Sequence, residues 1–321
     1  MISRTEFDAA TAVVRSVVPP TPQYCWPLLA RRLGTELWVK HENHTPIGAF
    51  KLRGGLVYLD HVRRTQPEVM GVISATRGNH GQSIACAAAR LGMTATLVVP
   101  HGNSTEKNRS MRAYGAELVE VGHDFQAAYE YAIGRAEAER LHLVPTFHPK
   151  LVQGVGTYGV ELFEAVPDLD VVYVPIGQGS GICGMIAARD ATGAKAEIVG
   201  VVAENAACYA LSLAAGHAVS TNTADTIADG LACRVPDEAA LAIVRKGVAH
   251  ITTVSEAEIR QAMRTLYSDT HNVAEGAGAA AFAAACKERH RLAGRKVAVV
   301  LSGGNVDRSV FAEVLAEPDM E

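Results

Sequence analysis

Short apolar runs recur along the chain, separated by longer stretches in which apolar residues return every three or four positions. The runs are rich in β-branched residues, as at positions 171–176 and 296–301. Such runs are typical of strands buried on both faces of a sheet, whereas the longer stretches are typical of amphipathic helices. Strand and helix alternate about every 20–25 residues, which predicts parallel sheets joined by crossover helices.

The predicted elements define the fold class and the domains. Strands are expected at residues 36–40, 71–75, 95–99, 116–121, 143–145, 171–176, 197–203 and 296–301. Helices are expected at residues 5–18, from 52 onward, 84–91, 105–114, 125–140, 153–164, 182–190, 256–267 and 277–287, with residues 205–250 less regular. The prediction is an α/β fold with two open, mostly parallel sheets flanked by helices. We expect a large domain at residues 1–70 plus 147–321 and a small mobile domain at residues 71–146.

Composition narrows the class of protein. With 48% hydrophobic residues the chain can bury a large core, and at a net charge of −4 it shows no basic stripe for nucleic acid. Apolar runs are shorter than the roughly 20 residues that a membrane span needs, and the N-terminus lacks a secretion-signal pattern. Six scattered cysteines predict buried thiols, not a disulfide frame or zinc site. We expect a cytoplasmic protein with no nucleic acid, membrane or metal partner.

A lysine stands where a loop meets a helix. Lys51 follows Phe50 and a turn that contains Pro46 and Gly48, and a helix is expected from Leu52. A helix N-terminus and a nearby arginine would both disfavour a charged ammonium, and a neutral lysine amine can form a Schiff base. A solvated surface lysine is the alternative, and it is the commoner case.

A glycine-rich loop joins a predicted strand to the next helix. In Gly177-Gln178-Gly179-Ser180-Gly181, closely spaced glycines let backbone N–H groups converge on an anion at the helix N-terminus. This pattern predicts a phosphate site. The alternative is a tight turn that needs glycine only for its backbone angles.

The same loop satisfies a second motif. Gly179, Gly181 and Gly184 have the G-x-G-x-x-G spacing of a dinucleotide site, and Glu204 lies about where a ribose-binding acid would stand. A nicotinamide-dependent oxidoreductase is therefore the alternative function from another class, although it leaves Lys51 without a role.

Two further loops follow predicted strands. Residues 76–80 (Thr-Arg-Gly-Asn-His) come after the strand at 71–75, and residues 302–305 (Ser-Gly-Gly-Asn) end the strand at 296–301. Because ligands of open α/β sheets bind beyond the strand carboxyl ends, three such loops and Lys51 predict one cleft. The first loop suits a carboxylate or a phenolic oxygen, or it only caps its own turn.

Four motifs resemble those of fold type II pyridoxal-phosphate enzymes, in the branch of threonine and serine dehydratases and serine racemase. They lie at residues 48–54 (Gly-Ala-Phe-Lys-Leu-Arg-Gly), 78–82 (Gly-Asn-His-Gly-Gln), 226–230 (Thr-Ile-Ala-Asp-Gly) and 301–305 (Leu-Ser-Gly-Gly-Asn). The resemblance extends from about residue 21 to residue 307. It implies a tryptophan-synthase-β-like fold and pyridoxal 5'-phosphate as the cofactor.

The resemblance also implies roles for individual residues. Lys51 would hold the cofactor covalently and act as the base at the substrate Cα, with Phe50 against the cofactor ring. Asn79 would hydrogen-bond the phenolic oxygen, and Ser302 would face the pyridine nitrogen. The phosphate would be held by Gly177, Gln178, Gly179, Ser180 and Gly181, and the substrate by Thr76, Arg77, Gly78, Asn79, His80 and Gly230.

The implied reaction is β-elimination from a 3-hydroxy amino acid, which yields a 2-oxo acid and ammonia. A serine does not keep the pyridine nitrogen protonated, so the ring is a weaker electron sink and a long-lived carbanion is disfavoured. Loss of the β-hydroxyl as the Cα proton departs avoids that carbanion. By similarity, we expect an ammonia-lyase of the threonine dehydratase type, with threonine as its default substrate. The same similarity predicts a homodimer.

Departures from the family pattern bear on specificity. Gln178 and Ser180 interrupt a loop that usually has four consecutive glycines, so side chains would replace some phosphate contacts.

Arg77 stands where serine racemase has a catalytic serine, so we expect little or no racemisation. If Arg77 faces the cleft, it pairs with an anionic side chain, as in 3-hydroxyaspartate, or stacks on an aromatic one, as in 3-phenylserine; bracing of its own loop is the alternative. Glu204 resembles a racemase metal ligand without a nearby acidic partner.

Four other polar residues near the motifs either line the cleft or serve the structure, and we expect the structural role for each. They are His148, Gln153, Tyr158 and His271. Glu275 follows the family pattern of a residue that approaches the cofactor ring. A non-catalytic amino-acid-binding relative is the third alternative, and the substrate's side chain and β-carbon stereochemistry stay open.

Overall fold

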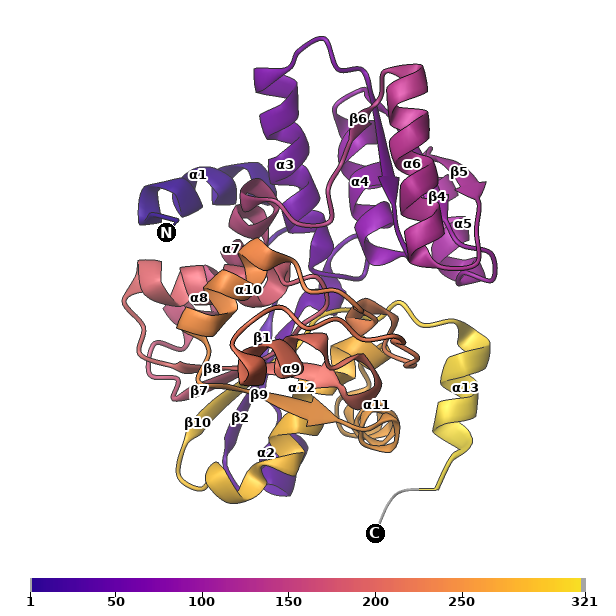
Figure 1. The fold of residues 1–321 in the computed structure, drawn as a ribbon. Helices are drawn as coiled ribbons and strands as arrows, with labels where there is room; N and C mark the ends of the chain where they lie inside the picture. Colours follow the sequence, from indigo (N-terminus) through magenta and orange to yellow (C-terminus); the bar gives the residue numbers. More distant parts are fainter. Residues whose placement is uncertain (1, 319–321) are drawn as a thin grey trace.

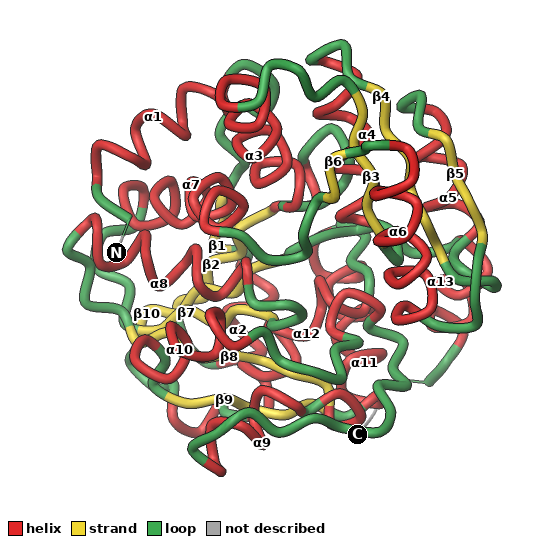
Figure 2. The backbone as a smooth tube through the Cα atoms, turned by 45° about the horizontal axis from the view of Figure 1, so that its top comes forward, coloured by secondary structure: helices red, strands yellow, loops and turns green. Residues whose placement is uncertain are grey.

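The computed structural model describes residues 2–318 and confirms the predicted α/β class. The strands form two separate, mostly parallel sheets with helices on their faces (Figure 1 and Figure 2). One sheet has the order β1-β2-β10-β7-β8-β9 and the other the order β5-β4-β3-β6. The strands are β1 (Gln23–Cys25), β2 (Glu36–His41), β3 (Gly71–Ala75), β4 (Thr94–Val99), β5 (Glu117–Glu120), β6 (His142–Leu143), β7 (Val171–Pro175), β8 (Glu197–Ala203), β9 (His250–Val254) and β10 (Lys296–Leu301).

In the six-stranded sheet, all neighbouring strands are parallel except β1 and β2. β1 pairs antiparallel along the edge of β2, with Tyr24 opposite Val39. β1 was not predicted, because a strand of only three residues, flanked by Pro22 and Pro27, is too short to show an alternating pattern. The central strand β10 pairs in parallel with β2 on one side and β7 on the other, so the carboxyl ends of all three share one edge of the sheet.

The four-stranded sheet is built within residues 71–143, and all its pairs are parallel. Its last strand, β6, is only two residues long, whereas a strand at 143–145 was predicted. Pairing stops after the N–H of Val144 donates to the carbonyl of Ile73 at 2.8 Å. Pro145 has no N–H to continue the ladder.

Every predicted helix is present and differs from the prediction only at its ends, and the structure adds helices that were not predicted. They are α1 (Arg4–Arg15), α2 (Pro27–Leu33), α3 (Lys51–Thr65), α4 (Asn79–Arg90), α5 (Thr105–Ala113), α6 (Phe125–Glu139), α7 (Pro149–Ala165), α8 (Ser180–Thr192), α9 (Cys208–Ala215), α10 (Glu238–Gly247), α11 (Glu256–Thr270), α12 (Gly276–Lys287) and α13 (Arg308–Ala316). α1 starts after Ser3, which forms a reciprocal capping box with Glu6. α3 begins at Lys51, one residue earlier than expected.

The elements that were not predicted lie at the edges of the molecule. The irregular stretch at residues 205–250 contains α9 and α10, and the edge strand β9 follows it. β9 is only partly buried and carries two threonines, so it lacks the apolar run of the central strands. α13 buries Val314, but most of its other residues are exposed or half-buried, which leaves little periodic signal.

The main helices pack closely through small residues. α12 is buried along nearly its whole length and lies against β7 and β10 through an alanine-rich face. α7 and α8 approach where Gly156 meets Gly184, because a Cβ on Gly184 would lie 2.8 Å from the backbone nitrogen of Gly156. These contacts hold α8, and the loop before it, against the centre of the large sheet.

Helix α3 joins the two parts of the molecule. It packs on α4, where a Cβ on Gly55 would lie 2.2 Å from Ser83 Oγ, and on α7, where Gly54 meets Leu151. A single apolar cluster contains Leu52 of α3 and Ile84 of α4. The upper part of Figure 1 therefore contains α3 as well as β3–β6. The division into a large domain and a mobile segment at residues 71–146 stays a prediction.

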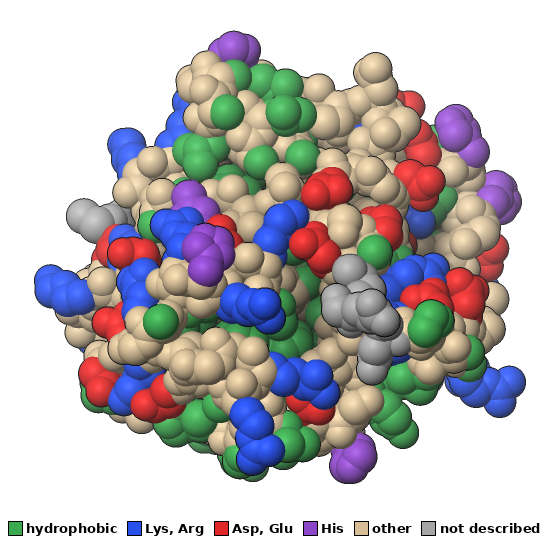
Figure 3. All heavy atoms as spheres, turned by 90° about the horizontal axis from the view of Figure 1, so that it is seen from below, with side chains coloured by type: hydrophobic (Ala, Val, Ile, Leu, Met, Phe, Trp, Pro, Cys, Tyr) green, Lys and Arg blue, Asp and Glu red, His purple; other side chains and the backbone are tan. Residues whose placement is uncertain are grey.

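The surface carries charges of both signs. On the face shown in Figure 3, lysine and arginine side chains are interspersed with aspartate and glutamate side chains. In the part of the chain that the structure describes, every helix is too short or too polar to cross a membrane.

Candidate active site

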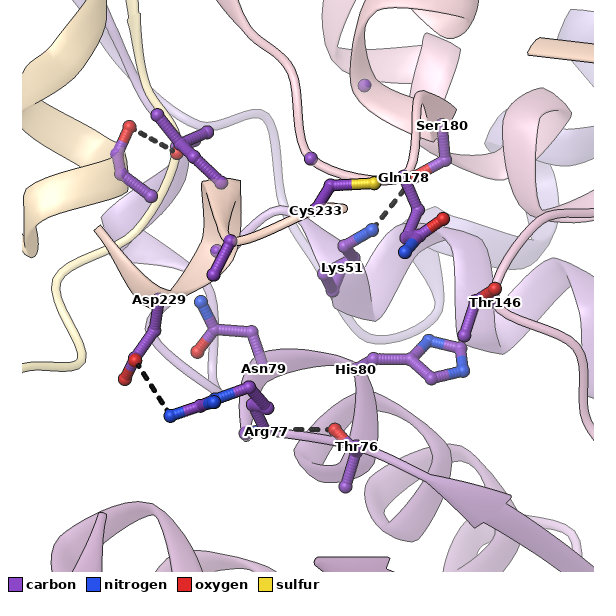
Figure 4. Close-up of a pocket in the computed structure, with 18 of the residues that line it drawn as sticks. Lys51, Thr76, Arg77, Asn79, His80, Thr146, Gln178, Ser180, Asp229 and Cys233 are labelled. Atoms are coloured by element: carbon purple, nitrogen blue, oxygen red, sulfur yellow. Dashed lines mark hydrogen bonds and ion pairs between the residues drawn. The ribbon is translucent and has the colours of Figure 1, made fainter. Parts of the chain in front are cut away.

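A pocket opens between the two sheets, where the loops after β3, β7 and β10 meet the start of α3 (Figure 4). Every residue predicted for the site lines it, although the positions lie far apart in the sequence. These residues are Phe50, Lys51, Thr76, Arg77, Gly78, Asn79, His80, Gly177, Gln178, Gly179, Ser180, Gly181, Gly230 and Ser302. The structure thus brings the predicted residues together in one cleft, and their roles stay predictions.

Lys51 begins α3 with its amine in the pocket. Its Nζ donates a hydrogen bond to Ser180 Oγ at 2.9 Å and lies 5.0 Å from the centre of the Phe50 ring. Burial lowers the pKa of Lys51 to about 8. The predicted depression is confirmed, but the proposed contribution of a nearby arginine was wrong. Arg53 is turned away, into hydrogen bonds with Glu42 and Glu161.

The backbone before Lys51 is fixed by the loop after β10. The N–H of Phe50 donates to the carbonyl of Ser302 at 3.1 Å, and the N–H of Gly304 donates to the carbonyl of Gly48 at 2.9 Å. Gly48 has a φ of +69°, and a Cβ there would lie 2.8 Å from Asn305 Oδ1. Only glycine meets both demands without strain. The turn and the strand end therefore hold the lysine in place.

The glycine loop forms an anion cradle at the start of α8. Gly179 is the N-cap residue with a φ of +98°, and no side chain caps the helix. The first helical bond runs from the N–H of Cys183 to the carbonyl of Gly179, so the N–H groups before it are left for a ligand. A Cβ on Gly177 would lie 2.1 Å from the Gly230 carbonyl oxygen. The cradle therefore fits a phosphate group beside Lys51.

The dinucleotide interpretation finds less support in the same loop. Gly184 is needed for the close approach of α8 to α7, as described above. Glu204 lies at the end of β8 and pairs with Lys287 at 3.5 Å. The glycine spacing therefore follows from helix packing and from the anion cradle. Among the described residues, no group of three His, Cys, Asp or Glu side chains is arranged to hold a metal ion.

Asn79 and Ser302 both line the pocket and are held by hydrogen bonds to the surrounding protein. Asn79 Nδ2 donates to Glu275 Oε1 at 2.5 Å, and its Oδ1 accepts from Asn305 Nδ2 at 2.8 Å. Ser302 is buried and its hydroxyl donates to the carbonyl of Ala277 at 3.3 Å. Both side chains are therefore held rigidly, as expected of groups that contact a cofactor ring.

The loop at residues 76–80 presents unpaired polar atoms to the pocket. Thr76 Oγ1 accepts from the N–H groups of Gly78 at 3.0 Å and Gly81 at 2.9 Å, which leaves its hydroxyl hydrogen for a ligand. His80 Nε2 and Arg77 Nε are buried without a hydrogen-bond partner. Burial lowers the pKa of His80 to about 3, so its ring is neutral. Buried orphan groups of this kind indicate a missing polar ligand, such as a substrate carboxylate.

Arg77 faces the pocket. Its Nη2 lies 3.5 Å from Asp229 Oδ1, and Figure 4 shows the guanidinium directed toward Asp229 across the entrance. This contact is long and the arginine is 40% exposed, so a ligand can compete for the guanidinium.

Several pocket residues were not predicted from the sequence. Lys107 of α5 is buried and ion-paired with Asp229 and Glu275, yet it lies in a polar helix that looks solvated in the sequence. Asp229 belongs to a recognised motif but was given no role. Phe125 and Cys233 also line the pocket, from stretches without a motif.

The residues expected to be structural are placed accordingly. His148 caps α7 by accepting from the N–H of Lys150, and His271 ends α11 with a φ of +53°. Gln153 donates to the carbonyl of Glu6, and Tyr158 packs edge-on against Phe50 from behind. None of these four is among the residues that line the pocket in the described part of the chain.

Comparisons with known proteins agree with this geometry. The model of the family described as pyridoxal-phosphate dependent enzyme matches residues 14–303. The L-threonine ammonia-lyase of Thermotoga maritima is 34% identical over 98% of this chain and 78% of its own length. The L-threo-3-hydroxyaspartate ammonia-lyase of Saccharomyces cerevisiae is 32% identical over 94% of this chain and 93% of its own. The structure of processed threonine deaminase isoform 2 from Solanum lycopersicum superposes with a TM-score of 0.90 at 30% identity, over 97% of this chain and 87% of that one.

Proposed function

The chain belongs to the family of pyridoxal-phosphate dependent enzymes, and from this premise we propose that it removes water and ammonia from a 3-hydroxy amino acid. It is a lyase of the threonine ammonia-lyase type, and its cofactor is pyridoxal 5'-phosphate. The observation that carries the proposal is the placement of the Lys51 amine beside Ser180, at the uncapped N-terminus of α8.

The residues of the pocket suit this cofactor. When bound, pyridoxal 5'-phosphate supplies an electron-accepting ring that makes the substrate Cα proton acidic. Lys51 would hold the cofactor and remove that proton, and burial supports this role because it keeps much of the amine neutral near pH 8. The free N–H groups of Ser180 and Gly181 would hold the phosphate, and Phe50 would pack on the ring.

Ser302 directs the outcome of the reaction. Its hydroxyl would not hold a proton on the pyridine nitrogen as an aspartate would, so the bound ring would be a weak electron sink. Loss of the β-hydroxyl together with the Cα proton would then be favoured. Thr76 and the N–H groups of residues 78–80 would bind the substrate carboxylate. Elimination is thus favoured over transamination, and Arg77, which stays protonated, is a poor acid or base for racemisation.

The rate at which the cofactor-free protein combines with pyridoxal 5'-phosphate is expected to rise with pH around a midpoint of about 8. Only the neutral amine attacks an aldehyde, and an unperturbed lysine would give a midpoint of roughly 10.4. Stopped-flow absorbance across the pH range measures the rate. A rate that still climbs steeply above pH 10 would show that Lys51 is not desolvated.

Threonine is the default substrate, and 3-hydroxyaspartate is the second candidate because Arg77 faces the pocket. The test is the steady-state formation of 2-oxo acid and ammonia from threonine, serine, 3-hydroxyaspartate and 3-phenylserine. Arg77→Ala is expected to lower kcat/KM for 3-hydroxyaspartate by about 10- to 100-fold if a desolvated pair is lost. The rates with threonine and serine should change far less.

The substrate panel separates the alternatives. Equal loss on all four substrates would assign Arg77 to its own loop, and loss confined to 3-phenylserine would indicate stacking. A protein that binds the cofactor but leaves every substrate intact would be a non-catalytic amino-acid-binding relative.

We further propose that the enzyme is a cytoplasmic homodimer whose segment at residues 71–146 closes over the substrate. The six cysteines are free thiols, which suits a reducing compartment. The four-stranded sheet and the large sheet supply opposite walls of the pocket, so a relative movement of the two would open and close it. Sedimentation velocity measures the oligomeric state directly.

A further inference from the structure

A charged network lies beside the pocket and joins α5 to the large sheet. Lys107 is 6% exposed, and its Nζ lies 3.1 Å from Glu275 Oε2 and 3.4 Å from Asp229 Oδ2. Glu275 is 4% exposed, and its other oxygen accepts the 2.5 Å hydrogen bond from Asn79. The buried ammonium of Lys107 is thus linked to the side-chain amide of Asn79 through the carboxylate of Glu275.

The side chain of Lys107 packs closely against the backbone at Gly78. Gly78 has a φ of +155°, and a Cβ at this position would lie 2.4 Å from Lys107 Cδ. The aliphatic part of the lysine therefore lies over Gly78, within the loop that also carries Asn79. A side chain at position 78 would displace Lys107 from the carboxylates.

The orientation of the Asn79 amide is fixed from both sides. Asn305 Nδ2 donates to the carbonyl of Ile47 at 2.8 Å. Because a carbonyl can only accept, this contact fixes which end of the Asn305 amide is the nitrogen. The same nitrogen donates to Asn79 Oδ1 at 2.8 Å. Asn79 must then direct its NH₂ group toward Glu275, and its second N–H remains for a ligand in the pocket.

This arrangement holds only while Glu275 is an acceptor. Burial by itself lowers the pKa of Lys107, but the Glu275 and Asp229 carboxylates outweigh it and the pKa is raised, so the ammonium persists. Without that ammonium, Glu275 would be a buried carboxylate with no cation on Oε2, and it would take up a proton or move. Either change would release the amide of Asn79.

We propose that Lys107 is a positioning residue, which holds Glu275 so that Asn79 donates an N–H to the phenolic oxygen of the cofactor. The inference rests on the proposed function, because it requires pyridoxal 5'-phosphate in the pocket. A donated hydrogen bond favours the anionic form of that oxygen. Lys107 therefore tunes the electronic state of the cofactor without touching it.

The test compares reconstituted holoprotein of Lys107→Met, Lys107→Arg and the double variant Lys107→Met with Glu275→Gln. Exposed Lys246 on α10 provides the control, as Lys246→Met. The measurements are the visible absorption band as a function of pH, kcat and KM on the best substrate, and the mass of the Lys51 peptide after hydride trapping.

Lys107→Met is expected to move the visible band to shorter wavelength and to lower kcat about 10- to 100-fold, with a smaller change in KM. Lys107→Arg should retain the band. The double variant should recover it, because the neutral amide introduced by Glu275→Gln still offers an acceptor to Asn79 and no longer needs a cation. A lysine that served only packing would not be rescued in this way.

Glu275→Leu removes the acceptor while leaving Lys107 in place, and it should shift the band in the same direction as Lys107→Met. It serves as the second variant if Lys107→Met does not fold. A trapped adduct on Lys51 with an unchanged band in these variants, or a double variant that does not recover, would overturn the role of Lys107 alone. Absence of any adduct in the unsubstituted protein would overturn the proposed function together with this inference.

Discussion

Replacement of Lys51 by alanine is expected to abolish turnover, with a loss of kcat/KM of at least about 10³-fold. The variant loses both the amine that would hold the cofactor and the base placed at the substrate Cα. Its pocket should still bind the phosphate group, because the cradle at residues 177–181 is formed by backbone N–H groups and does not depend on the lysine. The measurements are the release of 2-oxo acid and the mass of hydride-treated protein, which should show no cofactor adduct.

Two comparisons make this result specific. Exposed Lys195 offers a matched control, and Lys195→Ala should keep both the activity and the adduct. Lys51→Arg keeps a positive charge but no neutral primary amine, so it should be as inactive as Lys51→Ala. If either Lys51 variant still carried a trapped adduct on another lysine and turned over substrate, the assignment of the covalent link to Lys51 would be wrong.

The parts of the site that could be predicted are those where the local sequence restricts the backbone conformation or the space for a side chain. Gly48, Gly177 and Gly179 occupy positions that a side chain would fill or strain, so loops of this kind are recognisable without a structure. Lys51 was singled out because it stands between such a turn and a predicted helix, and its role came from the resemblance of residues 48–54 to the family motif. The central strands were equally clear, since burial on both faces requires continuous apolar runs.

The missed residues depend on contacts between distant segments. Lys107 lies in a polar stretch, and only its partners Asp229 and Glu275, more than 100 residues away, make it a buried residue. Nothing in the local pattern distinguishes it from a solvated helix lysine. β1 and β9 were missed for a related reason, because edge strands are short or half-exposed and their identity comes from the neighbour with which they pair.

The cause of the Lys51 pKa shift shows the same limit. The sequence places Arg53 two residues from Lys51, so electrostatic repulsion was a reasonable expectation. In the folded chain, Arg53 is fully buried on the other side of α3, with Nε 2.8 Å from Glu42 Oε2 and Nη1 2.8 Å from Glu161 Oε1. Its charge is therefore neutralised locally, and burial is the cause of the lowered pKa of Lys51.

The ion network around Arg53 fastens α3, which carries Lys51, to the large sheet and to α7. Glu42 follows β2 and Glu161 lies on α7, so the guanidinium ties α3 to both. Lys40 also reaches Glu161, at 2.7 Å. Burial by itself raises the pKa of Glu161, but Arg53 and Lys40 outweigh it and the pKa lies below its ordinary value. This contribution to stability is present above the ordinary pKa and is lost as the pH falls through the folded one.

Arg53→Met is therefore expected to destabilise the protein by about 3–5 kcal/mol at neutral pH, because two buried carboxylates lose their shared cation. The measurement is the free energy of unfolding in denaturant at several pH values. The deficit should shrink toward low pH, because the unsubstituted protein itself loses the Arg53–Glu161 contribution as Glu161 takes up a proton. Exposed Arg31 supplies the control, as Arg31→Met, which should change stability by less than about 0.5 kcal/mol.

The double variant Arg53→Met with Glu42→Gln distinguishes lost charge balance from lost packing. It removes one carboxylate with the cation and leaves Glu161 paired with Lys40 and, at 3.1 Å, with Arg15. Most of the stability should return if the unpaired charge is the cause. If the double variant stays as unstable as Arg53→Met, the Arg53 side chain stabilises the protein through packing. Its charge would then not be what fixes the position of α3 and Lys51.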